Sequence, residues 1–181
     1  KKINKTYENK NEVIVHNYAI SNNKIYNLYT PKIFGYELTL WSSFSKKYLK
    51  ERWTGFTNIN YADLKISKIK IKLEKLDKFK LKPHLIKIDA EGSELQIIKS
   101  AKKIIKKYLP ILIIEFHHKN FTKIKKILYK MNYKDYLFIS KKKGFVRLNK
   151  SLYKEILHKT TSVNITFYCN KSNLISRKNF K

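Results

Sequence analysis

The residues best suited to chemistry are three acids within the six-residue stretch Asp89-Ala90-Glu91-Gly92-Ser93-Glu94. The chain has 41 Lys and Arg but only 13 Asp and Glu, so three acids in six residues are a marked concentration. They directly follow the apolar run Leu85–Ile88. Ligands of open α/β sheets bind in the crevice outside the carboxyl ends of the strands. The sequence therefore predicts that Asp89 and Glu91 border an active site, where a carboxylate can accept a proton from a substrate hydroxyl.

A second polar group follows the next apolar run, residues 111–116. Glu115 lies at the end of this run, and His117 and His118 come directly after it. Histidine titrates close to neutral pH and suits proton transfer, so His117 is a candidate catalytic residue. These residues together with Asp89 are also candidate metal ligands. Neighbouring side chains on an extended segment point in opposite directions, so we expect a polar rim of the active site and no metal site.

The elements that position these acids follow from the apolar pattern. Residues 85–89, 111–116 and 136–139 read as strands separated by helices over residues 93–108 and 121–131, and Ser93 begins a capping-box pattern. This alternation predicts βαβ crossovers and a mostly parallel sheet with helices on both faces. The last strand is joined differently and is expected to be antiparallel. The near-continuous apolar character of residues 85–89 predicts a strand buried on both faces. Further strands are expected over residues 12–17, 24–29, 66–73 and 163–168, and further helices near 44–51 and over 151–158.

Two other segments have distinctive patterns. Residues 66–73 alternate Ile and Lys and indicate an exposed or edge strand. Residues 31–62 are rich in aromatic side chains and are expected to form a packed loop region around one short helix. Ser42 and Ser43, between Trp41 and Phe44, make this region a candidate lid or acceptor pocket.

Length, composition and charge limit the classes of protein to which the chain can belong. With 181 residues, 43% of them hydrophobic, we expect a single domain over residues 1–181 and a frayed polar tail over residues 170–181. There is no apolar run long enough for a transmembrane helix, and the single Cys169 favours a cytoplasmic setting. The net charge of +28 comes almost entirely from lysines spread along the chain. Because nucleic-acid readers rely on clustered arginines, we expect a solvated basic surface and no nucleic-acid partner.

The stretch Leu85–Glu94, read as hydrophobic-Ile-Lys-Ile-Asp-x-Glu-Gly-x-Glu, resembles the signature of the FkbM family of S-adenosylmethionine-dependent methyltransferases. Leu76-Asp77 resembles the step before that signature, Val13–Ser21 resembles the third strand of the family, and Val163–Phe167 resembles its closing strand. The resemblance covers about residues 10–170.

This resemblance implies a Rossmann-like methyltransferase sheet and transfer of a methyl group from S-adenosylmethionine to a hydroxyl of a sugar, glycan or secondary metabolite. It places Asp89 towards donor and substrate, with Glu91 and His117 as further catalytic candidates. Asn17 and Ala19, at the end of the third strand, are expected to contact the cofactor together with Asp89.

The sequence departs from the family pattern at the cofactor site. Family members begin their cofactor fold with a glycine-rich turn, whereas this chain has four glycines and no GxGxxG pattern. We therefore expect an N-terminally truncated domain that lacks part of the cofactor site and is inactive by itself. Two alternatives stay open: a non-catalytic, degenerate or truncated domain that binds a partner, and a basic nucleic-acid-binding domain.

Overall fold

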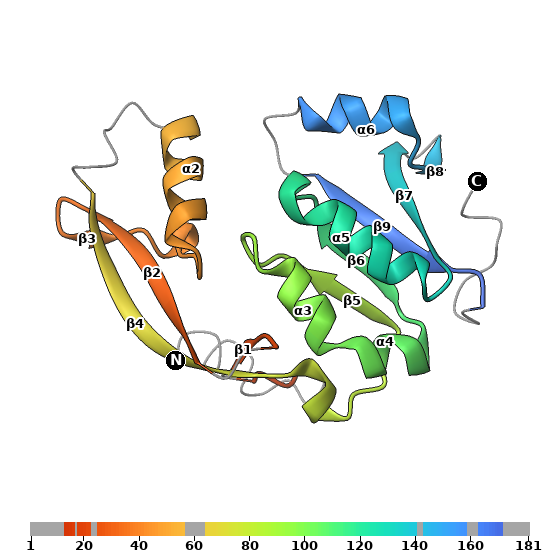
Figure 1. The fold of residues 1–181 in the computed structure, drawn as a ribbon, viewed down its shortest axis with the longest axis horizontal. Helices are drawn as coiled ribbons and strands as arrows, with labels where there is room; N and C mark the ends of the chain where they lie inside the picture. The colour runs from red at the N-terminus through yellow and green to blue at the C-terminus, as the bar shows by residue number, and fades with distance from the viewer. Residues whose placement is uncertain are drawn as a thin grey trace.

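The computed structural model describes residues 13–16, 18–22, 25–56, 64–140, 143–158 and 163–171. These residues form a four-stranded sheet and a five-stranded sheet with associated helices (Figure 1). The smaller sheet, orange and yellow in Figure 1, lies beside helix α2, and the larger one, green to blue, lies behind helices α3 to α5. Both sheets are mixed, and none of the described helices has the length and apolar character needed to span a membrane.

The smaller sheet has the strand order β1-β4-β2-β3. Its strands are β1 (Ala19–Ile20), β2 (Ile25–Ile33), β3 (Tyr36–Glu37) and β4 (Lys65–Glu74). The β2–β4 pair is antiparallel and continuous, and β1 runs parallel to the end of β4. The prediction of an exposed or edge strand is confirmed over residues 66–72, because β1 pairs with β4 only at Leu73 and Glu74 and β2 pairs with the rest. Lys68, Lys70 and Lys72 of this strand are all exposed.

In the N-terminal third one prediction was wrong, and a second, the helix near residues 44–51, is confirmed as α2 with different bounds. Residues 13–16 are not in a strand, and residues 12 and 17 lie outside the described part of the chain. Only Ala19 and Ile20 pair with β4. The aromatic region is also more regular than expected, because β2 continues through Pro31 to Ile33 and the helix lies later and is longer. The elements there are β3, a 3₁₀ turn η1 (Thr39–Trp41) and α2 (Lys46–Phe56).

The larger sheet has the strand order β5-β6-β9-β7-β8. Its strands are β5 (Leu85–Ile88), β6 (Ile111–Glu115), β7 (Tyr133–Ser140), β8 (Gly144–Arg147) and β9 (Asn164–Cys169). The prediction of a mostly parallel sheet was wrong, because only the β5–β6 pair is parallel. Strands β5, β6 and β7 do run in one direction, as the crossovers require. The last strand β9 is antiparallel, as predicted, and it enters between β6 and β7.

The helices of the larger sheet are α3 (Glu94–Ser100), α4 (Lys102–Tyr108), α5 (His118–Tyr129) and α6 (Lys150–Leu157). Their apolar residues form one cluster with the same face of the strands, including the fully buried Ile98, Ile105, Leu112, Leu128 and Ile165. The opposite face holds a small cluster of strand residues alone, namely Ile111, Tyr136 and Tyr168 with Phe145. The prediction of helices on both faces of the sheet was therefore wrong, because in the part of the chain that the structure describes they pack on one face. Strand β5 was also predicted to be buried on both faces, yet Leu85 is 52% exposed at the end of the sheet.

The predicted single helix over residues 93–108 is two helices. The backbone leaves helical geometry at Ala101, where ψ is 9°. The carboxylate of Asp77, in the 3₁₀ turn η3 (Leu76–Phe79), accepts hydrogen bonds from the backbone N–H groups of Lys103 (3.1 Å) and Ile104 (2.9 Å). These are unpaired donors of the first turn of α4, which need an external partner. The break is therefore stabilised by a residue far away in the sequence.

Candidate functional site

The acid-rich stretch is a tight turn between β5 and α3, which we call the acid turn (Asp89–Ser93). Two consecutive residues in it have left-handed backbone geometry, Glu91 with φ 49° and Gly92 with φ 95°. Glycine adopts this geometry freely, whereas glutamate does so at a cost of order 1 kcal/mol. A glutamate held in this conformation needs support from its surroundings, and three sets of contacts provide it.

The first support comes from Glu94, which is completely buried at the start of α3. Its Oε1 accepts hydrogen bonds from the backbone N–H of Gly92 (2.9 Å) and of Ala90 (3.2 Å). Ser93 occupies the N-cap position but makes no side-chain cap, so the predicted capping box does not form. Burial raises the pKa of Glu94 above its usual 4.5 in spite of these hydrogen bonds. Glu94 therefore fixes the acid turn from inside the protein.

This buried acid predicts a pH-dependent effect of Glu94→Gln. Unfolded chains ionise Glu94 near pH 4.5, whereas the folded protein keeps its proton to higher pH, so stability is lost as pH rises through that window. Glutamine keeps an acceptor for the two N–H groups and does not ionise. We expect the variant to gain free energy of unfolding relative to the unaltered protein between about pH 4 and about pH 8, measured by urea denaturation. Glu94→Leu serves as the control and should lose about 1–3 kcal/mol at both pH values. If the difference in free energy of unfolding between Glu94→Gln and the unaltered protein did not change with pH, the raised pKa of Glu94 would be contradicted.

The second support is Tyr48 on α2. Its hydroxyl donates to Glu91 Oε2 at 3.3 Å, and its ring lies 3.5 Å from the position that a Cβ on Gly92 would occupy. The same ring meets His117 edge-on, with 4.8 Å between centroids. Ser43, just before α2, donates its hydroxyl to the backbone O of Glu91 at 3.4 Å. The segment that includes the start of α2 thus contacts the acid turn, although the two are distant in sequence.

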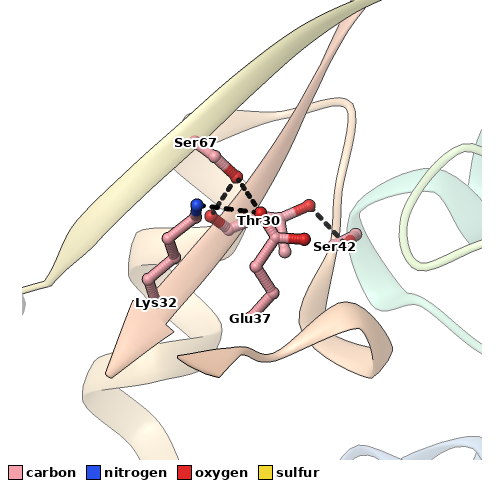
Figure 2. A network of polar contacts seen from close by, with 5 residues as sticks. All are labelled: Thr30, Lys32, Glu37, Ser42 and Ser67. Atoms are coloured by element: carbon pink, nitrogen blue, oxygen red, sulfur yellow. Dashed lines mark hydrogen bonds and ion pairs between the residues drawn. The ribbon is translucent and has the colours of Figure 1, made fainter. Parts of the chain in front are cut away.

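The segment before α2 is fixed to the smaller sheet by the polar network in Figure 2. Thr30 and Ser42 share a hydrogen bond between their hydroxyls at 2.8 Å, and Ser67 Oγ donates to the backbone O of Thr30 at 3.2 Å. Glu37 accepts from Lys32 at 3.0 Å, and the hydrogen bond from Lys32 holds the pKa of Glu37 below its usual value. Because this network anchors Ser42, it also positions Ser43 and Tyr48 towards Glu91.

The third support comes from the start of α5. Asn120 Nδ2 donates to the backbone O of Gly92 at 3.0 Å. His117 is the N-cap residue of α5, and its ring stacks with that of His118 at 5.7 Å between centroids. The two rings therefore lie side by side and not in opposite directions, because the helix begins between them.

The predicted acids do come together. Asp89, Glu91 and Glu115 each offer a carboxylate oxygen, and these oxygens lie within 4.8 Å of one another. Asp89 also forms an ion pair with Lys87 at 2.5 Å. The three carboxylates are the group of described residues that could hold a cation, although acids arranged in this way often hold none.

A cavity of about 150 Å³ adjoins the acid turn. It is lined by Ser21, Tyr26, Phe44, Ser45, Leu73, Glu91, Gly92, Ser93, Leu95, Gln96 and Asn120. A cavity of about this size holds one benzene ring in another protein, so it has room for one six-membered ring. Ser21 directly follows β1, which brings the end of this strand to the acid turn. Ala19 itself pairs with Leu73, and Asn17 lies outside the described residues.

Sequence reasoning found the acids, His117 and the Ser43–Phe44 segment, but it missed Tyr48, Asn120 and the structural role of Glu94. Asn120 had a signal in the sequence, since it is a polar residue in the first turn after the second acidic strand end. Tyr48 had none beyond the aromatic richness of its region, because its partner Glu91 is distant in the sequence.

The fold and the site define an α/β protein whose acids gather where two parallel strands end. Residues 2–145 match the family model of the methyltransferase FkbM domain. The chain therefore belongs to the FkbM methyltransferase family and is a methyltransferase, as the acid signature predicted. No match was found among curated proteins or among solved structures.

Membership in this family implies S-adenosylmethionine as the methyl donor in general terms. The cavity beside the acid turn, at about 150 Å³, has room for one ring and not for a nucleoside joined to an amino acid, so this cavity does not hold the whole cofactor. It is a ring-sized space beside Glu91 that is lined by hydroxyl, amide and apolar side chains.

Proposed function

We propose that the chain acts in S-adenosylmethionine-dependent O-methylation of a hydroxyl on a sugar, glycan or secondary metabolite. The observation that carries this proposal is the position of Glu91. Its carboxylate borders a cavity the size of one ring, within reach of the Tyr48 hydroxyl at 3.3 Å. The other lining side chains include hydroxyls and amides, which suit a polyhydroxyl acceptor, and the rings of Tyr26 and Phe44, which suit its apolar face.

In this proposal Glu91 accepts the proton of the acceptor hydroxyl, and Tyr48 holds the carboxylate in place. A positioned carboxylate base contributes about 10²- to 10⁴-fold to a rate. Asp89, oriented by Lys87, and His117, packed against Tyr48, complete the polar rim and hold the acceptor oxygen for reaction. Ala19 and Asp89 are our proposed cofactor contacts, supported by the approach of the end of β1 to the acid turn. A cytoplasmic location, which the single free Cys169 favours, belongs to the same proposal.

The test is methyl transfer to a panel of methyl glycosides, followed by mass spectrometry of the products. We expect products that carry one added O-methyl group, and we expect Asp89→Ala to abolish their formation because the rim loses its oriented carboxylate. Glu155→Ala is the control, since Glu155 is an exposed acid on α6, away from the acid turn. Unchanged turnover by Asp89→Ala, or equal losses in the two variants, would contradict the role of Asp89.

A second candidate is a non-catalytic methyltransferase-like domain. The small size of the cavity beside the acid turn favours it, because this cavity has room for one ring and not for the whole cofactor. Calorimetric titration of the protein with S-adenosylhomocysteine separates the two functions. Tight binding supports the enzyme, whereas no binding together with no methyl transfer supports the non-catalytic domain.

A further inference from the structure

A second and larger cavity lies between α5 and α6. Its volume is about 500 Å³, within the range of small-molecule sites. It is lined by Phe121, Thr122 and Lys125 of α5, and by Leu148, Asn149, Lys150, Tyr153 and Lys154 at and before α6. None of these residues lines the cavity beside the acid turn, so the two spaces are separate.

One wall of this cavity is aromatic. The rings of Phe121 and Tyr153 lie nearly parallel, 5.9 Å apart at an angle of 28°. Phe116 packs against both, at 5.0 Å from Phe121 and 5.8 Å from Tyr153. Rings held by one another in this way form a fixed surface on which a flat apolar group can pack.

Three of the other lining residues, Lys125, Lys150 and Lys154, are basic, and no acid lines the cavity. Lys150 and Lys154 lie one turn apart on the same side of α6, where like charges destabilise a helix. Lys150 also occupies the first turn, and this end of the helix favours negative charge and has no acid. Among the described residues, neither lysine has an acidic partner. An anion between them would relieve both unfavourable interactions.

Lys125 has a different role in the same cavity. It pairs with the completely buried Asp135 at 2.8 Å, so its charge is already compensated. Burial alone would lower the pKa of Lys125, but hydrogen bonds to Asp135 and Tyr129 raise it above its usual value of 10.5. The charge available to a ligand therefore lies on Lys150 and Lys154.

We propose that the cavity between α5 and α6 binds a small aromatic anion. The aromatic ring of the ligand packs on Phe121 and Tyr153, and its anionic group lies between Lys150 and Lys154. This site is independent of the methyl-transfer function proposed for the acid turn.

The experiment is a fluorescence titration of the protein with anilinonaphthalene sulfonate, an aromatic anion that becomes bright in an apolar site. We expect saturable binding that weakens with added salt. The double variant Lys150→Gln/Lys154→Gln should raise Kd about tenfold, since it removes both charged partners of the anion. Tyr153→Ala should also weaken binding, because the aromatic wall loses one ring.

The matched control is Lys102→Gln/Lys106→Gln, which removes an equally spaced pair of exposed lysines from α4. This variant should bind the probe as the unaltered protein does. The uncharged probe N-phenylnaphthylamine should bind at least about tenfold more weakly than the sulfonate, since it lacks the anionic group. Equal losses in the two double variants, equal binding of the two probes, or no saturable binding would each overturn the proposal.

Discussion

Replacing Glu91 with glutamine is expected to lower kcat for methyl transfer about 10²- to 10⁴-fold, with little change in KM for the acceptor. Glutamine has the same size and keeps an acceptor for the Tyr48 hydroxyl, so the acid turn and its cavity should persist. What it loses is the capacity to take a proton. Initial rates over a range of acceptor concentrations give kcat and KM separately.

Two further variants make this result specific. Tyr48→Phe removes only the hydroxyl that holds Glu91, so kcat should fall about tenfold, as expected for one lost hydrogen bond of about 1.4 kcal/mol. Glu155→Gln changes an exposed acid on α6 and should leave the rate unaltered. A Glu91→Gln enzyme with a normal kcat and a raised KM would show that Glu91 binds the acceptor without accepting its proton.

Replacing Lys125 with methionine is expected to lower the free energy of unfolding by about 3 kcal/mol. Methionine keeps the apolar stem but leaves the completely buried Asp135 without its ion-pair partner. The hydroxyl of Tyr129 still donates to Asp135, and the lysine side chain is 33% exposed, so we place the loss at the lower end of the range for buried pairs. For a domain of this size the melting temperature should fall by about 6–12 °C in differential scanning calorimetry.

The exposed neighbour Lys126 provides the matched control for this prediction. Lys126→Met should change the melting temperature by little, because surface charges contribute little. Adding Asp135→Asn to Lys125→Met should restore part of the loss by removing the buried charge. If both lysine variants melt at the same temperature, the Lys125–Asp135 pair does not stabilise the fold.

The local part of the fold could be predicted from the sequence. Apolar runs identified β5, β6 and β9, and the acids at the ends of β5 and β6 indicated the candidate site. The pattern could also show that Asp89, Glu91 and Glu115 meet, because parallel neighbouring strands end at one edge.

The remainder depends on contacts between distant residues. Nothing near Ala101 indicates that Asp77 caps α4, and nothing near Tyr48 indicates that Glu91 is its partner. Nothing near Glu94 in the sequence indicates that it is buried and bonded to the backbone of the acid turn. The parallel character of the sheet was overestimated because β9 is inserted between β6 and β7, and the apolar pattern that identifies β9 as a strand does not show its place in the sheet.

The position of β9 has a consequence for synthesis on the ribosome. Strand β9 follows β6 and β7 in the chain, yet it lies between them and supplies the hydrogen-bonding partner of both. Until residues 164–169 leave the exit tunnel, these two strands present unpaired apolar edges of the kind that promotes aggregation. The larger sheet is therefore completed only after β9 has been made, whereas the β2–β4 ribbon, whose strands both precede the larger sheet, can form before it.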